Sequence, residues 1–303
     1  MFKNILVPLD GSKLAESALA PAVTIAQAFS ASITLFHVIE KGAPSNVHGD
    51  RHLASFAEAQ EYLDSLAQTL PQHITAATHV HANGTNDVAR SIVDHTLELE
   101  RDLIVMCTHG SGGFRGFIYG SIAQQVLSIG ETPLMLMHRV QGTPPAPFEC
   151  KHLLVPLDGD PEHEQALPVA TAFMQAFSAD LHLLAVVHTL MTLPGHQAAV
   201  ARLLPGTARA YLSVQEEEMQ MHLKATATRL SHSSGPVTWS VKRGDPVHSI
   251  VRAAEDKSAS LILMGTHGKS GSTAFWANSV APGVSNRTRL PLLLVPINAS
   301  GLD

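Results

Sequence analysis

Short apolar runs alternate with amphipathic stretches along almost the whole chain. The first run, Asn4 to Leu9, is rich in leucine and β-branched residues and is followed by Asp-Gly, which predicts a buried strand. Ser12 is then a candidate N-cap for a helix whose small and apolar residues lie on one face. We expect Pro21 to kink this helix without breaking it.

The same alternation continues through the first half of the chain. Further strands are expected at Ile33–Ile39, Ile74–His81, Leu103–Cys107 and Leu134–His138. Further helices are expected at Phe56–Leu70, Val88–Leu99 and Gly120–Ser128. Strands that alternate with helices in this way predict an α/β fold, in which helices cover both faces of an open parallel sheet.

The sequence of the first half returns in the second half. Val-Pro-Leu-Asp-Gly occurs at residues 7–11 and again at 155–159, a shift of 148, and Ser-Ile-Val occurs at 91–93 and again at 249–251, a shift of 158. Matches in the same order over nearly the whole chain indicate a duplication. We therefore predict two domains, residues 1–140 and 148–303, joined by a proline-rich linker at 141–147.

The second copy is ten residues longer than the first between its second strand and its third helix (158 minus 148). This region contains Leu-Pro-Gly at 193–195 and again at 204–206. We expect a surface loop here, and a functional lid is the alternative.

Composition restricts the class of protein. The 303 residues are 45% hydrophobic and 15% charged, which fits two folded domains. A net charge of −6 argues against general nucleic-acid binding, although backbone N–H groups alone can bind one phosphate. No apolar run reaches the roughly 18 residues of a membrane span, no signal peptide is apparent, and two cysteines suggest no disulfide framework. We expect a cytoplasmic protein.

The residues that could carry chemistry follow the first and fourth predicted strands. Ligands of open parallel sheets bind at the carboxyl ends of the strands, where the strand order reverses. Asp10 follows the first strand, and a glycine-rich stretch at 108–116 follows the fourth and leads to Gly120-Ser121 at a helix start. Glycines and a helix N-terminus can bind an anion, and Asp10 can accept hydrogen bonds from a sugar or a base. The alternative is that the glycines only form a turn and that Asp10 only caps the first helix.

At these residues the chain resembles the universal stress protein family. Nucleotide-binding members of that family carry Gly, two residues, Gly, nine residues, then Gly followed by Ser or Thr. The first half has Cys107, Gly110 and Gly120-Ser121 at these places, and the second half has Gly265, Gly268 and Asn278-Ser279. The resemblance covers nearly all of both halves and implies two tandem five-stranded domains with the Rossmann-like fold of the adenine nucleotide alpha hydrolases.

The resemblance also implies a bound ATP or AMP, with or without Mg²⁺, in the first half. The adenine and ribose contacts that it implies are Pro8, Asp10, Val38, Met106 and Cys107, and the phosphate contacts are Gly110, Gly120, Ser121 and the N–H group of Ile122. The matching residues of the second half are Asp158, Val186, Gly265, Gly268 and Ser279. Asn278 replaces the glycine next to the phosphate, and this substitution favours the first half as the binding site.

Neither a metal site nor a set of catalytic residues is predicted. His79 and His81 project to the same face of a strand and could both ligate zinc, but the aligned positions of the second copy are Trp239 and Val241. No nucleophile with a base can be placed from the sequence, so we expect no enzyme and at most slow, incidental ATP hydrolysis.

The function implied by the resemblance is that of a stress-response sensor or switch that binds an adenine nucleotide. A structural or interaction module that has lost the nucleotide is the alternative, and an ATP-handling enzyme of the wider group is a third. The resemblance further implies that the last strands of the two copies, Leu134–His138 and Leu292–Val295, meet in an intrachain pseudo-dimer. Association of intact chains into a homodimer stays open. We expect neither nucleic acid nor a membrane as a partner.

Overall fold

The computed structural model describes residues 1–42, 46–47, 49–109, 121–139, 148–161, 163–267 and 280–297. The predicted linker lies outside these residues. Contacts between residues divide the chain into two compact units, which are described separately. Within the described ranges the first unit contains residues 1–149, 267 and 291–297, and the second contains 150–266 and 280–290.

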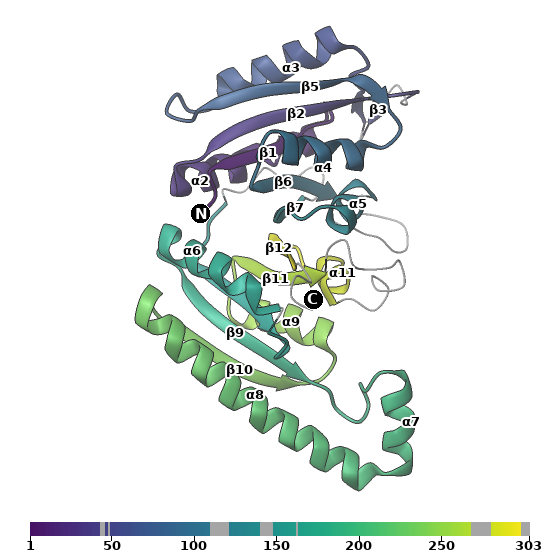
Figure 1. Ribbon diagram of the computed structural model, residues 1–303, viewed down its shortest axis with the longest axis vertical. Helices are drawn as coiled ribbons and strands as arrows, with labels where there is room; N and C mark the ends of the chain where they lie inside the picture. The colour runs from purple at the N-terminus through teal and green to yellow at the C-terminus, as the bar shows by residue number, and fades with distance from the viewer. Residues whose placement is uncertain are drawn as a thin grey trace. The chain divides into compact units, whose positions relative to one another are not determined.

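The first unit contains a parallel five-stranded sheet (Figure 1). Its strands are β1 (Asn4–Pro8), β2 (Ser32–Glu40), β5 (Ala76–Thr85), β6 (Leu103–His109) and β7 (Leu134–Arg139). They lie in the order β7-β6-β1-β2-β5, and each neighbouring pair is parallel. The parallel α/β sheet predicted from the alternating pattern is therefore confirmed in this half.

Helices cover this sheet, because three consecutive residues in the middle of β1 are buried and a strand of this kind has no face in water. The helices of the unit are α1 (Lys13–Glu16), α2 (Leu19–Phe29), α3 (Phe56–Thr69), α4 (Val88–Glu98) and α5 (Ser121–Ile129). Helix α2 packs on β1 and β2, α3 packs on β2 and β5, and α4 packs on α5. A short hairpin of β3 (Asn46–Val47) and β4 (Asp50–Arg51) follows β2.

The first helix is broken and not merely kinked. Ser12 caps α1 as predicted, but α1 ends after four residues and α2 begins at Leu19. Pro21 lies in the first turn of α2. A proline ring clashes with the carbonyl four residues earlier, here that of Ser17, and proline has no N–H to donate to it. The expectation of an unbroken helix was therefore wrong.

The second unit repeats the first four strands of this topology. Its strands are β8 (His152–Leu157), β9 (Asp180–Val187), β10 (Val237–Arg243) and β11 (Leu261–His267). They lie in the order β10-β9-β8-β11, and each neighbouring pair is parallel. Its helical elements are η1 (His163–Ala166), α6 (Leu167–Phe177), α7 (Gly195–Leu203), α8 (Pro205–Ser234), α9 (Pro246–Asp256) and α11 (Val280–Ser285).

The longer region of the second copy is helical, so the surface loop expected there was wrong. The first Leu-Pro-Gly opens α7 and the second opens α8. Pro205 takes the first position of α8, where a missing N–H costs nothing and the fixed φ suits a helix. Helix α8 has 30 residues, whereas α3, its counterpart in the first copy, has 14.

The last strand of the second copy, β12 (Leu292–Ile297), pairs with β7 in the first unit. The pairing is antiparallel and joins Leu292 to Leu136 and Leu294 to Leu134. All six residues of β12 are buried. The predicted contact between the last strands of the two copies is therefore present.

In each unit, the side chain just before the fourth strand accepts hydrogen bonds from the backbone at the start of the first strand. In the first unit the Asp102 carboxylate accepts hydrogen bonds from the backbone N–H groups of Lys3 (2.6 Å) and Asn4 (2.9 Å). In the second unit the hydroxyl of Ser260 accepts from the N–H groups of Lys151 (2.9 Å) and His152 (3.0 Å). Two different side chains therefore make the same connection.

Replacing Asp102 should weaken the first unit. We expect Asp102→Ala to lower the free energy of unfolding by about 1–3 kcal/mol, because two strand N–H groups lose their acceptor. Asp102→Ser should recover part of this loss, because Ser260 makes the equivalent bonds. Urea unfolding measures both variants, with Asp94→Ala on the exposed side of α4 as the control. Equal losses for Ala and Ser would contradict this assignment.

Candidate functional site

Strands β1 and β6 lie side by side at the point where the strand order reverses. Their pairing joins Ile5 to Leu103 and Leu6 to Ile104, and β2 flanks β1 on its other side. The carboxyl ends of parallel strands meet at one edge of a sheet, and the reversal point is where open α/β sheets form ligand crevices. The carboxyl ends of β1 and β6 therefore lie next to each other at this edge.

The residues predicted to contact a nucleoside come from these three adjacent strands. Pro8, Asp10, Met106 and Cys107 are half-buried, and Val38 is buried in β2 opposite His81 of β5. The five positions thus belong to one edge of the first sheet. None of these positions has been shown to bind a ligand, and their role stays a prediction.

The predicted phosphate contacts are only partly within the described residues. Gly110 and Gly120 lie outside them. Helix α5 begins at Ser121, and Ile122 follows, half-buried, in its first turn. In the second copy Val186 and Gly265 are half-buried at their strands, whereas Gly268 and Ser279 lie outside the described residues.

Asp10 organises the chain turn after β1. Its Oδ1 accepts hydrogen bonds from the backbone N–H (2.9 Å) and the hydroxyl (2.6 Å) of Ser12. The Ser12 hydroxyl in turn accepts from the N–H of Ala15 and so caps α1. Asp10 is therefore not the cap that the structural alternative made it, but it supports the start of α1 through Ser12, and this role is compatible with a second one toward a ligand.

His37 is a positioning residue that the sequence analysis did not identify. It is buried in β2, and its Nδ1 lies 2.7 Å from the carbonyl oxygen of Leu9, the residue before Asp10. Its Nε2 lies 3.4 Å from the carbonyl oxygen of Leu53. Burial lowers the pKa of His37. This effect outweighs the hydrogen bonds to the two carbonyls, which would raise the pKa. The neutral ring therefore donates from Nδ1 to Leu9 and holds the end of β1 in place.

Carboxylates gather beside the start of α1. Glu16 pairs with Lys13 at 2.8 Å and accepts a hydrogen bond from the hydroxyl of Tyr62, while Asp50 accepts one from the N–H of Lys13. Burial raises the pKa of Tyr62 strongly, and the charges of Glu16, Asp10 and Asp50 raise it further. This side of the edge is negative and suits hydroxyl or amine donors better than phosphate.

His138 adds no positive charge to the β6 side of the edge. Its Nδ1 lies 3.3 Å from the hydroxyl of Thr108, at the end of β6. Burial lowers the pKa of His138 to about 4, so the ring is neutral near pH 7. The His138 ring therefore offers no charge to an anion near Thr108.

The matching aspartate of the second copy has a different environment. Both carboxylate oxygens of Asp158 lie within 2.8 Å of His163 Nδ1, and Oδ1 also accepts from the N–H of Asp160. Burial alone would raise the pKa of Asp158, but the His163 hydrogen bond and charge outweigh it, so the pKa is lowered. His163 aligns with Ala15 of the first copy (163 minus 148), where no side chain can make this contact.

Helix α8 also approaches the turn after the first strand of the second copy. A Cβ atom on Gly159 would lie 2.7 Å from the methyl carbon of Met219, and the φ of Gly159 is +84°. Only glycine fits this combination of conformation and space. The aligned Gly11 of the first copy, with a φ of +89°, is confined in a similar way, because a Cβ atom there would lie 3.0 Å from Cγ of Leu53.

His79 and His81 project to one face of β5, as predicted, and meet a third histidine there. The ring of His95 on α4 lies 4.9 Å from each of them, measured between ring centroids. Within the described ranges no group of three or more His, Cys, Asp or Glu side chains is placed to hold a metal ion. The sheet register aligns these histidines with Ser240 and Lys242, so the alignment with Trp239 and Val241 was wrong by one residue.

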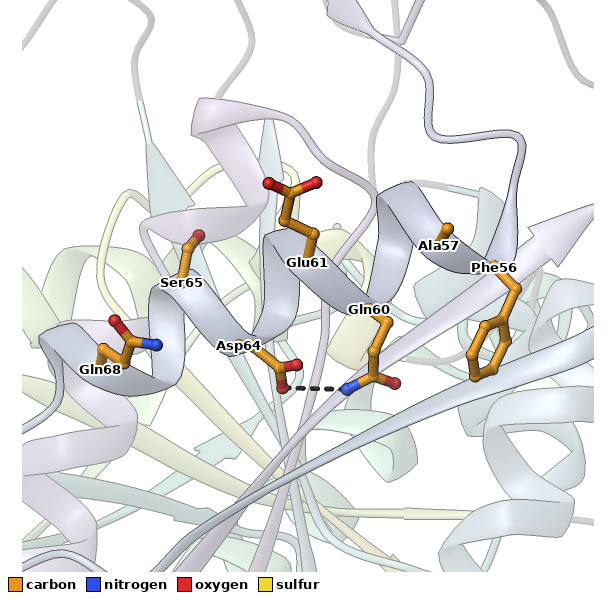
Figure 2. Close-up of a pocket in the computed structure, with 7 residues that line it drawn as sticks. All are labelled: Phe56, Ala57, Gln60, Glu61, Asp64, Ser65 and Gln68. Atoms are coloured by element: carbon orange, nitrogen blue, oxygen red, sulfur yellow. Dashed lines mark hydrogen bonds between the residues drawn. The ribbon is translucent and has the colours of Figure 1, made fainter.

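A depression on the surface of α3 is not part of this edge. Figure 2 shows that its lining side chains all come from that one helix, with Gln60 donating to Asp64 at 2.9 Å. Phe56 is the large apolar member of the group and is 51% exposed. No strand end contributes to this lining. The edge formed by β1, β2 and β6 is therefore the better candidate site.

The lowered pKa of His37 predicts a loss of stability in acid. An unfolded histidine titrates near pH 6.5 and the buried one at lower pH, so the unfolded chain binds the proton first as the pH falls. At pH values below about 6.5, the free energy of unfolding should decrease by up to about 1.4 kcal/mol per pH unit because of this one proton. His37→Gln, which can still donate to Leu9 but does not titrate, should reduce that slope.

Urea unfolding between pH 7.5 and pH 5 measures this slope. His248→Gln, at an exposed position, is the matched control and should leave the slope close to that of the wild type. Identical slopes for His37→Gln and the wild type would show that His37 is not a source of the acid sensitivity.

Comparison with known proteins agrees with the repeat and with the fold. The family model described as "Universal stress protein family" matches residues 1–138 and again 149–296. A universal stress protein of Mycolicibacterium smegmatis is 25% identical over 306 residues, which covers 96% of each chain. Universal stress protein MJ0531 of Methanocaldococcus jannaschii is 26% identical over 144 residues, 46% of this chain and 84% of that one.

Among solved structures, the crystal structure of a universal stress protein from Archaeoglobus fulgidus superposes with a TM-score of 0.67 at 19% identity, covering 97% of this chain and 98% of that one. At this identity the superposition establishes the fold only. The two family matches extend over nearly the whole sequence and coincide with the duplication seen in the residues. The chain therefore belongs to the universal stress protein family, as a member with two tandem copies of the domain.

Proposed function

We propose that this universal stress protein binds an adenine nucleotide, ATP or AMP, at the strand edge of its first copy, and acts as a stress-response sensor or switch. The observation that carries the proposal is the pairing of β1 with β6 at the reversal of strand order, because it brings the Asp10 turn next to Met106 and Cys107. The ligand would rest with its ribose or base toward Asp10 and with its phosphates toward the start of α5.

The distribution of charge supports this orientation. Asp10, Glu16 and Asp50 make one side of the edge favourable for ribose hydroxyls and the adenine amine. The start of α5 carries N–H groups that point away from the helix, together with the positive end of the helix dipole. Mg²⁺ would accompany the triphosphate if ATP is the ligand.

The two copies would differ in affinity, with the first copy binding more tightly. Asp158 is held by His163 on both carboxylate oxygens, and Met219 lies against Gly159. A ligand in the second copy would have to displace His163 and accommodate Asn278 in place of glycine. The first copy has Ala15 and Gly120 at the positions of His163 and Asn278, whereas Gly11, like Gly159, is confined by a neighbouring side chain, that of Leu53.

We further propose that the protein is cytoplasmic and is not an enzyme beyond slow, incidental ATP hydrolysis. No helix in the described ranges has the length and apolar character of a membrane span. The described carboxylates at the edge are all engaged within the protein, Asp10 with Ser12, Glu16 with Lys13, and Asp50 with the N–H of Lys13. A switch needs only that the bound and the free protein differ in conformation.

A nucleotide-free structural or interaction module is the second candidate function. The bonds from Asp10 to Ser12 favour it, since they give Asp10 a structural role that needs no ligand. Mass spectrometry of freshly purified and denatured protein distinguishes the two. Released adenine nucleotide supports the sensor, and its persistent absence even after addition of ATP supports the module.

The binding test compares the two aspartates in the intact chain. Asp10→Ala should weaken ATP affinity about 10- to 100-fold, the effect of losing a hydrogen bond to a charged group of about 1.5–3 kcal/mol. Asp158→Ala, the matched control in the second copy, should change it less than about twofold. Isothermal titration calorimetry measures both affinities, and thermal unfolding confirms that each variant is folded.

Gly120→Val is the complementary variant on the phosphate side. A branched side chain next to the phosphates should abolish ATP binding while the protein remains folded. Unchanged affinity in both Asp10→Ala and Gly120→Val would place the nucleotide elsewhere. A larger effect of Asp158→Ala would move the site to the second copy.

A further inference from the structure

The helical extension of the second copy has no counterpart in the first. Helix α8 has 30 residues and is about 45 Å long at 1.5 Å per residue. Its C-terminal half packs on β9 and β10 and buries Leu223, Ala227 and Leu230. Figure 1 shows α7 and the N-terminal half of α8 extending past the ends of these strands. The sheet therefore supports only part of the helix.

This extension exposes large apolar side chains. Those of Leu204, Tyr211, Val214 and Met221 on and next to α8 are 57%, 58%, 51% and 66% exposed, and Leu203 at the end of α7 is 82% exposed. The inner side of the same stretch buries Leu212. Single exposed apolar residues are ordinary, but a contiguous row of them on a helix marks an interaction surface.

The spacing of this row is that of a coiled-coil seam. Most residues of this stretch are exposed, and among them the N-cap Leu204 and the helical positions 207, 211, 214, 218 and 221 are separated by three, four, three, four and three residues. Intervals of three and four place side chains in one line along a helix and form the a and d positions of a heptad. We call these six residues the α8 stripe.

The α8 stripe reads the same from both ends. From either end it runs apolar, polar, apolar, apolar, polar, apolar, with its centre between Leu212 and Ser213. An antiparallel copy of the helix would place Leu204 on Met221, Thr207 on Glu218 and Tyr211 on Val214, and the reverse pairs would form at the same time. A twofold interface requires this reciprocity, in which residue i meets j and j meets i.

The polar members of the α8 stripe select the direction of pairing. In a parallel pair Glu218 would lie beside Glu218 of the other copy, and like charges in a seam are unfavourable. In the antiparallel pair each Glu218 faces Thr207, whose hydroxyl can donate to the carboxylate. We propose that the α8 stripe is a self-association surface on which a second copy of this chain packs antiparallel.

The size of the surface sets the expected strength of the dimer. The stripe spans about 26 Å, and a helix-pair seam of this length falls at or below the roughly 1,200 Å² low end of stable protein interfaces. The dimer should therefore exchange with monomer as the concentration changes. This inference depends only on the second unit and does not require that the nucleotide site is occupied.

The experiment measures the mass of the intact chain by sedimentation velocity over a concentration series that extends well above the micromolar range. The wild type should shift from monomer to dimer. Val214→Glu places a charge opposite Tyr211 at the centre of the seam and should raise the dimer dissociation constant by at least about tenfold. Leu97→Glu, a matched exposed apolar position on α4 that is 58% exposed, should leave it unchanged.

A charge pair tests the antiparallel register. Tyr211→Lys alone should also weaken the dimer, whereas Tyr211→Lys combined with Val214→Glu should restore association, since each Lys then faces a Glu only in this register. Thermal unfolding of each single variant shows whether it is folded. A wild type that stays monomeric, a dimer insensitive to Val214→Glu, or a double variant no better than the single ones would overturn the proposal.

Discussion

The parallel pairing of β1 with β6 is the contact on which the rest of the first unit depends. It inserts β1 between β2 and β6, which buries both faces of the strand and places the reversal of strand order beside it. The Asp102 carboxylate stabilises the start of β1 by accepting hydrogen bonds from the backbone N–H groups of Lys3 and Asn4. At the opposite end, His37 holds the carbonyl of Leu9. The turn that carries Asp10 is thus defined by polar contacts at both ends of one short strand.

The two copies share this scaffold and differ at the turn that follows it. Asp10 is bonded to Ser12, which caps a helix, whereas Asp158 is bonded to the His163 side chain. The difference arises from two aligned positions, Ser12 and Ala15 in the first copy and Asp160 and His163 in the second. A duplicated domain allows such divergence, because the sheets are maintained by their own buried strands while the loops at one edge change.

The sequence predicted the strands well, because buried parallel strands are nearly continuous apolar runs that the pattern of residues exposes directly. It failed where the outcome depended on backbone atoms. Pro21 ended a helix through the carbonyl of Ser17, and the two Leu-Pro-Gly sequences began helices where their prolines suggested a loop. His37 escaped notice because its partners are the carbonyls of Leu9 and Leu53, which leave no trace in the sequence. The residues predicted to contact a nucleoside lie at one edge of the sheet because the strand order places β6, β1 and β2 next to each other.

Helix α8 contacts the turn after β8 on one side and carries the exposed stripe on the other. On its inner side Met219 lies against Gly159, next to Asp158, and on its outer side the stripe includes the neighbouring Glu218 and Met221. A helix whose N-terminal half buries so little apolar surface gains little stability from its own unit. Covering the outer side with a second copy would stabilise that half and, through Met219, the turn at Gly159.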